Sequence, residues 1–490
     1  MMKISRIVMM TVMAAAIPAA AKVVTYPAGP GVETLGDFSV EVRQDGGAWQ
    51  PVSVYPVKVD EVRGARHHVE TASMACFDFD GKVDVRVISN REKVKDARVR
   101  PLSYKIIPAC AGDTLTFSLD RPRNLSVEVN GDIFHNLHLF ANPIDRFRPT
   151  DKEIKKAIRN RGKKGNKLVY FGPGVHELPG DTLRVESGQT VYIDGGARVY
   201  GELIAEGVRD VKFHGRGEVH PKGKGAGVSV RRSKNIEAEG IMLTQIPVGG
   251  SDSVRIDNVK SISYYGWGDG MNVFASDNVS YDNVFCRNSD DCNTVYATRK
   301  GFVGGCKNIK MENSTLWADV AHPIMIGLHG AATEIGIDAP ADTIQNLLYR
   351  NIDILDQKEK QVDYQGCMAI SCGDNNIVRD VTFDNIRVED IREGQLINIR
   401  IFFNKKYCAA PGTCVENVLF KDVEYNGHNA NLSIIAGYDD TRKVKGITFD
   451  NLVINGVRIA DEMPGKPGWY KTSDFANMFI GEHVEDVMFK

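Results

Sequence analysis

From Leu168 onward the chain carries a degenerate repeat of short, strand-like segments. Each unit has a polar pair, an alternating apolar segment, a central Asn or Asp and a second short segment, as in 307–317 (KNIKMENSTLW) and 379–390 (RDVTFDNIRVED). The first apolar position recurs 18 to 38 residues apart, at Val211, Ile236, Val254, Val279, Ile309, Leu347, Val381, Val418 and Ile447. Repeats of this length without helical segments are typical of β-solenoids, in which each coil stacks on the next.

We therefore predict an all-β fold with a right-handed parallel β-helix over residues 168–490. A β-propeller is the alternative, but it needs four strands in each unit of roughly 40 residues, and these units contain fewer. The variable spacing indicates loops inserted on one face of the solenoid. The insertions at 327–345 and 404–412 are expected to set how far a cleft on that face is closed.

Residues 22–147 follow a different pattern, with period-two alternation such as Phe38–Arg43 (FSVEVR) between Gly and Asn turns. This pattern is typical of antiparallel β-sandwiches, and we predict such a domain ahead of the β-helix. Residues 148–167 form the expected linker. Thr150 and Glu153 have the spacing of a capping box, which predicts a short helix there.

The first 21 residues have the features of a secretory signal peptide. Lys3 and Arg6 precede an apolar stretch that is too short to cross a bilayer by itself, and residues 19–21 (AAA) give a cleavage pattern. We expect export to the periplasm or outside the cell, without a membrane anchor. The net charge of −2 gives no reason to expect a nucleic-acid partner.

Nine cysteines could form disulfides in that compartment, although the odd number leaves at least one unpaired. Cys408 and Cys414 could close a small loop, but the sequence leaves the pairing open. No zinc-ribbon spacing is present, so structural zinc is not expected. The sequence contains no coiled-coil pattern, and we expect a monomer.

Asp269 and the pair Asp290-Asp291 are the candidate catalytic residues. Asp269 lies 21 residues before Asp290, which is about one coil. Because stacked coils lie ~4.8 Å apart, the three carboxylates should share one surface, and at least one pKa should rise. A protonated carboxyl beside ionised carboxylates is what acid-catalysed cleavage of a glycosidic bond requires. The alternative for Asp290-Asp291 is an ordinary polar turn.

The same residues resemble known motifs. WGDG at 267–270 followed by NSDDC at 288–292 resembles the NTDG and N-x-DDC motifs of glycoside hydrolase family 28, the polygalacturonase family. The run AHPIMIG, which contains His322, is similar to that family's G-H-G-x-S-I-G segment. The sandwich ahead of the β-helix, with the strand at 170–175, looks more like family 49, which contains dextranases and isopullulanases.

The resemblance implies a parallel β-helix enzyme that hydrolyses a polysaccharide or oligosaccharide with inversion of configuration and without a cofactor. It implies that Asp290 is the general acid. Asp269 and Asp291 would hold and activate the attacking water. Polygalacturonases also carry an R-I-K triplet that holds the substrate carboxylate, and here Cys367, Met368 and Ala369 stand in its place. We therefore expect a neutral or differently anchored glycan and weak activity on polygalacturonate.

Other side chains are candidates for substrate binding. Trp267, and less strongly Tyr264, Tyr265 and Trp317, could cover apolar sugar faces. His322 could tune the general acid or bind a sugar hydroxyl, and His329 could also contact the sugar. Arg400 could anchor an anion, although a structural role is the alternative. The competing functions are a polygalacturonase or pectin side-chain hydrolase, a polysaccharide lyase, and a non-catalytic glycan-binding β-helix.

Overall fold

The computed structural model describes residues 22–64, 66–163, 165–266 and 268–490. The signal peptide expected over residues 1–21 and the predicted binding residue Trp267 lie outside this part of the chain. None of the helices in the described part is long and apolar enough to cross a membrane.

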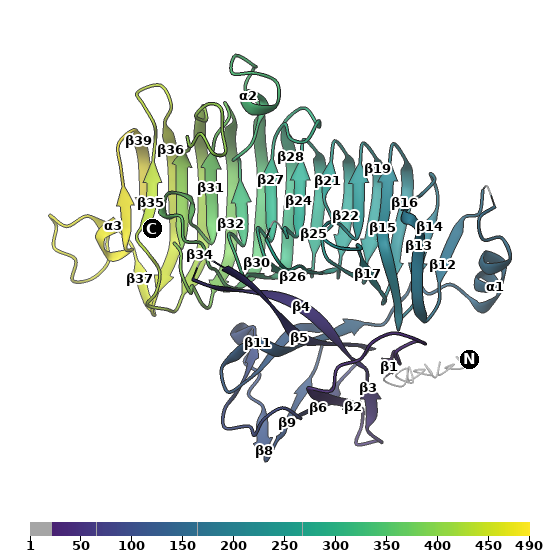
Figure 1. Cartoon of the computed structure of the whole chain (residues 1–490). Helices are drawn as coiled ribbons and strands as arrows, with labels where there is room; N and C mark the ends of the chain where they lie inside the picture. The colour runs from purple at the N-terminus through teal and green to yellow at the C-terminus, as the bar shows by residue number, and fades with distance from the viewer. Residues whose placement is uncertain (1–21, 65, 164, 267) are drawn as a thin grey trace, which may run out of the picture.

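The repeat region forms one 28-stranded sheet that winds from β12 (Leu168–Phe171) to β39 (Val484–Phe489) (Figure 1). Strands pair in parallel with the equivalent strand of the next coil. The leading apolar positions form one continuous ladder, because each pairs with the next from Val211 to Ile447. The predicted parallel β-helix is confirmed, and the alternative of a β-propeller is wrong.

Aromatic rings line part of the interior of the β-helix, one from each coil. Neighbouring rings in this stack have centroids 4.7 to 5.4 Å apart, and the stack consists of Tyr349, Phe383, Phe420, Phe449 and Phe489. Such a stack extends the backbone ladder into the core, so the register of the coils is held by packing as well as by hydrogen bonds.

The recurring Asn of each unit sits where the chain bends within a coil. Asn313 and Asn351 have φ values of 52° and 56°, in the left-handed region that Asn adopts more readily than most residues. Their side chains also join neighbouring coils. Nδ2 of Asn351 donates to Oδ1 of Asn313 at 2.7 Å, and Nδ2 of Asn313 donates to Oδ1 of Asp282 at 2.8 Å.

The N-terminal domain consists of two sheets packed around a buried apolar core. The five-stranded sheet, which contains β2 (Phe38–Arg43) and β6 (Val83–Ser89), is antiparallel throughout. In the six-stranded sheet, β5 (Arg66–Phe79) pairs in parallel with β11 (Asp132–Pro143). The sandwich is therefore not purely antiparallel, because strands of both sheets lie in the long connection that parallel neighbours require.

The linker contains α1 (Asp151–Arg159), which begins with the expected capping box. The backbone N–H of Thr150 donates to the carboxylate of Glu153 at 2.8 Å, and the backbone N–H of Glu153 donates to Oγ1 of Thr150 at 3.4 Å. β12 of the β-helix follows from Leu168.

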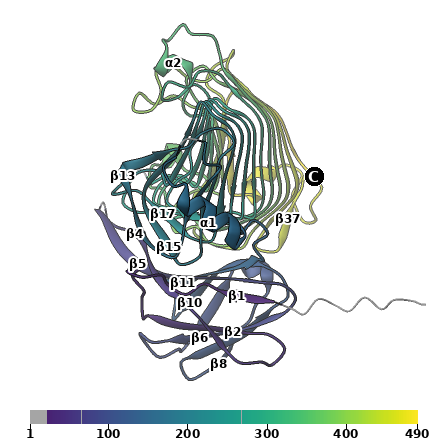
Figure 2. The ribbon, with the colours of Figure 1, turned by 90° about the vertical axis from the view of Figure 1, so that its right-hand side faces the viewer.

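The two domains meet along one side of the β-helix (Figures 1 and 2). Apolar side chains from both domains form one buried cluster, which includes Val57 and Phe140 of the sandwich and Phe285 of the β-helix. The buried guanidinium of Arg216, in the β-helix, contacts the buried carboxylate of Asp78 in β5 at 3.0 Å. Because an unpaired buried charge is costly, this ion pair fixes the position of one domain on the other.

All nine cysteines are free thiols. The suggested disulfide between Cys408 and Cys414 is therefore not formed. Sγ of Cys408 is buried 3.4 Å from the carbonyl oxygen of Leu328, whereas Cys414 begins β34 (Cys414–Tyr425). The two side chains belong to different contacts, and the short loop between them needs no cross-link.

We predict that Asn313→Ala lowers the free energy of unfolding by about 2 kcal/mol, because Ala disfavours the left-handed conformation and loses both side-chain hydrogen bonds. Asn313→Gly should cost about half as much, since glycine accepts that conformation and only the hydrogen bonds are lost. Equilibrium unfolding in urea measures both variants. Equal losses would contradict the role given to the backbone conformation.

Candidate active site

Three strands of neighbouring coils place two aspartates and a histidine in one column. Asp269, Asp291 and His322 each lie two residues before the start of a strand. These strands pair in parallel at their first residues: β24 (Met271–Phe274), β27 (Asn293–Tyr296) and β29 (Ile324–Ile326). Residues at equivalent positions of stacked coils lie ~4.8 Å apart, so Asp291 is between Asp269 and His322.

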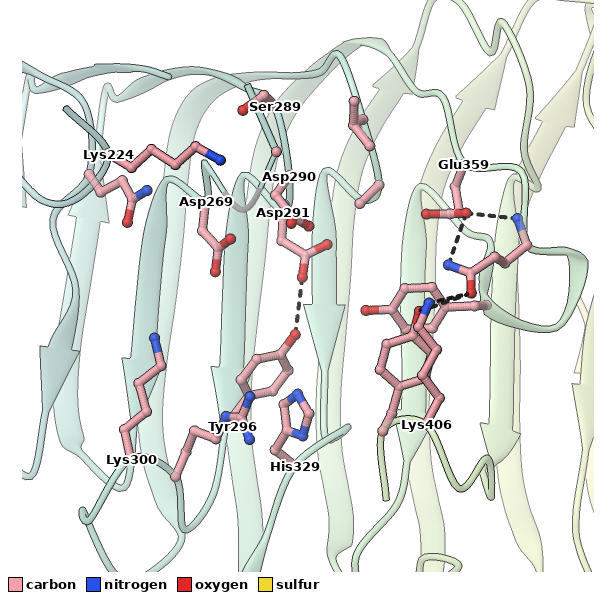
Figure 3. A pocket seen from close by; sticks show the side chains of 18 of the residues that line it. Lys224, Asp269, Ser289, Asp290, Asp291, Tyr296, Lys300, His329, Glu359 and Lys406 are labelled. Carbon is pink, nitrogen blue, oxygen red and sulfur yellow. Dashed lines mark hydrogen bonds between the residues drawn. The ribbon is translucent and has the colours of Figure 1, made fainter. Parts of the chain in front are cut away.

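Asp269, Asp290 and Asp291 line one cavity of about 820 Å³ on the face of the β-helix (Figure 3). The sequence spacing thus placed the carboxylates of Asp269 and of the Asp290-Asp291 pair together correctly. Their catalytic roles remain predictions. The volume is within the usual range for a site that binds a small molecule or a few sugar residues.

Three polar contacts surround the carboxylate of Asp291. Its Oδ1 lies 2.6 Å from Nδ1 of His322 and accepts the backbone N–H of the same residue at 3.2 Å. Its Oδ2 accepts the hydroxyl of Tyr296 at 3.0 Å. Hydrogen bonds of this kind stabilise the charged carboxylate and fix its orientation.

His322 lies behind the carboxylates, which corrects its predicted role in binding sugar. The side chain is fully buried. Nδ1 contacts Asp291 and Nε2 contacts the carbonyl oxygen of Tyr364, so both ring nitrogens are occupied. Burial disfavours the protonated ring, but the charge and hydrogen bond of Asp291, together with Glu359 and the carbonyl oxygen of Tyr364, outweigh that effect and raise the pKa of His322. His322 therefore positions Asp291.

Asp290 and Asp269 lack this support and are disfavoured as charged groups. Burial, followed by the negative charges of Asp269 and Asp291, raises the pKa of Asp290 well above its usual range. Burial, followed by the charge of Asp291, raises the pKa of Asp269 to about 7. A hydrogen bond of 2.6 Å from Nδ2 of Asn272 and the cation of Lys300 oppose the rise at Asp269.

His329 lies at the cavity, and its role in binding a sugar stays a prediction. It lines the cavity, and its ring packs edge-on against Tyr296 with centroids 4.9 Å apart. Burial lowers the pKa of His329 to about 3, so the ring is neutral at ordinary pH. Its Nδ1 is buried and has no hydrogen-bond partner among the described residues.

Arg400 is placed as a structural residue, which corrects its prediction as an anion anchor. Its Nη1 donates to the carbonyl oxygen of Asp363 at 2.9 Å, and it is absent from the lining of the cavity.

Of the aromatic residues that were predicted to bind sugar, only some of those described lie at the cavity. Tyr265 lines the cavity, Tyr264 packs under Lys58, and Trp317 is fully buried against Arg287.

The residues at the place of the R-I-K triplet contribute nothing to anion binding. Cys367, Met368 and Ala369 are fully buried, and none lines the cavity. The preference for a neutral glycan that was inferred from the missing triplet stays a prediction. Among the described residues, no cluster of three or more His, Cys, Asp or Glu side chains is placed to hold a metal ion.

The cavity also contains charged residues that the sequence did not predict (Figure 3). They are Lys224, Arg299, Lys300, Glu359 and Lys406. Arg299 and Lys300 could have been found, because they follow the strand that begins after Asp291. Glu359 and Lys406 lie in inserted loops without a repeat to place them. Both insertions named from the sequence reach the cavity, one through Thr333 and the other through Lys406.

No protein family model matches the chain, and no curated protein matches its sequence. Among solved structures it is similar to Dex49A from Penicillium minioluteum, with a TM-score of 0.51 and 14% identity over 94% of this chain and 96% of that chain. It also matches a family 28 exopolygalacturonase from Yersinia enterocolitica, with a TM-score of 0.46 and 12% identity over 83% of this chain and 96% of that chain. The first of these shows that the expected fold is shared across nearly the whole of both chains.

Proposed function

We propose that the protein is a secreted glycoside hydrolase that cleaves an O-glycosidic bond of a polysaccharide with inversion. Asp290 is the general acid, and Asp269 and Asp291 hold and activate water. The observation that carries the proposal is the unequal environment of three carboxylates in one cavity. Asp291 contacts three donors, whereas burial and neighbouring charges raise the pKa of Asp290 and favour its protonated form.

These environments match the steps of the reaction. The protonated carboxyl of Asp290 donates its proton to the glycosidic oxygen as the bond to the anomeric carbon breaks. Asp291, fixed by His322, orients a water molecule on the opposite face of the sugar. Asp269 shares that water and must be ionised to accept its proton. Lys300 lowers the pKa of Asp269 and so favours the ionised form.

The same inequality separates hydrolysis from the competing functions. A polysaccharide lyase removes a proton next to a uronate with a basic side chain and gains nothing from a protonated carboxyl beside an ionised one. A glycan-binding protein without activity does not need clustered carboxylates, which are costly to bury together.

For the substrate we propose a neutral glycan, such as a dextran-like chain, because the uronate-binding triplet is missing. A second candidate is an acidic glycan, such as polygalacturonate or a pectin side chain, held by different cations. Lys224 and Lys300 favour it, since both line the cavity beside Asp269 (Figure 3). Lys300 has no ion-pair partner among the described residues, so an anionic sugar could provide one.

The first prediction concerns stereochemistry. An acid and a base on opposite sides of the anomeric carbon displace the leaving group in one step, so the product should form with inverted configuration. Proton NMR of the first-formed product, recorded before mutarotation on whichever glycan is cleaved, tests this. A product with the configuration of the substrate would overturn the mechanism and the roles assigned to the aspartates.

Asp290→Asn should lower kcat on unactivated glycans by at least ~10³-fold, because the leaving oxygen loses its proton donor. The loss should be much smaller on a substrate whose leaving group departs without protonation, such as an aryl glycoside. Initial rates on both substrates measure the difference. Equal losses on the two would remove Asp290 from the role of general acid.

The same variant should be more stable than the wild type at neutral pH. The raised pKa means that folded Asp290 binds its proton more tightly than the unfolded chain, so the wild type loses stability as pH rises above about 4. Asn avoids this loss, and we expect a gain in stability at pH 7 that shrinks as the pH falls and disappears near pH 3.

Urea unfolding across this pH range measures the gain, and Asp252→Asn is the control. Hydrogen bonds from Lys234 and Asn278 lower the pKa of Asp252, on the surface, to about 2. That carboxylate stabilises the fold above pH ~4 and stops doing so as pH falls through its folded pKa, so its removal should give the opposite pH dependence. A gain that is independent of pH in Asp290→Asn would contradict the assigned protonation.

Lys300→Gln should move the acidic limb of the kcat/KM profile upward by roughly half a pH unit. Removing the cation raises the pKa of Asp269, so a higher pH is needed to ionise this base. Lys310→Gln, on the surface of β28 (Cys306–Ala318), should leave the profile unchanged. An increase in KM on an acidic glycan alone would support the second candidate substrate. An unmoved acidic limb would remove Lys300 from the control of Asp269.

A further inference from the structure

A long hairpin of the N-terminal domain, β4 (Val54–Arg63) and β5, lies against the side of the β-helix (Figures 1 and 2). Its base is fixed by the apolar cluster between the domains. Near its end, the Nζ of Lys358 donates to the carbonyl oxygen of Val62 at 2.7 Å, and the Nζ of Lys360 donates to that of Gly64. Both lysines lie in the loop that carries Glu359 into the cavity. The end of the hairpin is thus hydrogen-bonded to the loop that forms part of the cavity wall.

His67, near the end of this hairpin, lines the cavity that contains the three aspartates. Its Nδ1 lies 2.5 Å from Oδ2 of Asp60 on the paired strand. The side chain of Asp60 is fully buried, whereas that of His67 is 36% exposed. The backbone N–H of Gly266, in the β-helix, donates to the same Oδ2 at 3.4 Å. The pair therefore sits where the two domains meet.

Asp60 is costly as a structural residue. A buried carboxylate normally has a Lys or Arg partner, and among the described residues Asp60 pairs with His67 alone. Its Oδ1 has no hydrogen-bond partner in the described chain. The carboxylate accepts a hydrogen bond from the Nδ1–H of the His67 imidazole. This bond fixes the orientation of the ring and leaves Nε2 for another partner. No described residue bonds to that Nε2.

The surroundings of His67 are those of a sugar-binding surface. Its ring lies 5.9 Å from the ring of Tyr265, which is 48% exposed and lines the same cavity. Nζ of Lys224 lies 4.2 Å from the centre of the Tyr265 ring. An exposed aromatic ring beside hydrogen-bonding side chains suits a sugar, which has apolar faces and hydroxyl edges.

We propose that the N-terminal domain supplies one sugar-binding subsite of the proposed hydrolase. In this subsite Nε2 of His67, oriented by Asp60, accepts a hydrogen bond from a hydroxyl of a sugar residue that packs against Tyr265. This sugar neighbours the one cleaved between Asp269 and Asp290. The inference rests on the proposed function. It adds a binding residue that comes from outside the β-helix.

The test uses the full chain with two probes, isomaltohexaose and hexagalacturonate, and measures hydrolysis and binding separately. On the probe that is cleaved, His67→Ala should raise KM about tenfold while kcat changes less than about threefold, because binding is lost and the reacting groups are untouched. His67→Gln, whose amide can still accept a hydrogen bond, should recover part of the loss. His68→Ala, at the next position of the same strand, is the matched control and should behave as the wild type.

Calorimetry on the inactive Asp290→Asn background gives the affinity without turnover. There, adding His67→Ala should weaken binding about tenfold, and the effects of His67→Ala and Tyr265→Ala should be non-additive because they contact one sugar. The subsite would be overturned by unchanged affinity or by a fall in kcat with unchanged KM. It would also be overturned if His67→Ala had a lower melting temperature than His68→Ala and lost kcat. If the wild type cleaves neither probe and Asp290→Asn binds neither, the proposed function falls on these glycans and the subsite falls with it.

Discussion

Parallel stacking in register is the constraint on which the rest of the molecule depends. Because each coil repeats the position of the one before, a side chain at one place in a coil has a neighbour ~4.8 Å away in the next. In the core this builds the aromatic stack, and at the bends it builds the chain of Asn side chains. At the cavity it places Asp269 directly beside Asp291 and Asp291 beside His322. The same geometry that stabilises the core thus crowds the carboxylates.

Carboxylates that lie close together repel one another when they are charged. The surroundings of the three carboxylates in this cavity differ. Asp291 contacts donors from the next coil and from its own strand, so its orientation is fixed. Asp269 accepts one hydrogen bond from the Asn272 amide and is also influenced by the cation of Lys300, but burial and then the charge of Asp291 raise its pKa to about 7. Asp290 has the least support. A repetitive fold can therefore give chemically distinct environments to three identical side chains, because the residues on adjacent coils are not identical.

The sequence predicted what the repeat controls. The ladder from Val211 to Ile447 follows from hydrophobic spacing, and the shared cavity of the aspartates follows from the length of a coil. The direction in which a side chain points was harder to predict. His322 and Arg400 are close to the site in sequence pattern, yet hydrogen bonds turn them away from it.

Contributions from irregular segments had no pattern to reveal them. Glu359 and Lys406 enter the cavity on inserted loops, whose paths are set by local contacts that no repeat encodes. His67 comes from another domain, about two hundred residues before the aspartates, and only the packing between domains brings it there. Trp317 was expected at the site because it is an aromatic residue near the motif in sequence. Instead it is fully buried and packs against Arg287.

The buried pair of Asp78 and Arg216 also affects the order in which the molecule is assembled. A chain is synthesised from its N-terminus, so the sandwich and its carboxylate exist before the arginine that neutralises it. Until the coils with Arg216 and Phe285 are made, the docking face of the sandwich exposes apolar surface and an unmatched charge. The sandwich, which is synthesised first, thus buries its docking face only when the β-helix packs on it. That face can serve as a template for the folding of the early coils.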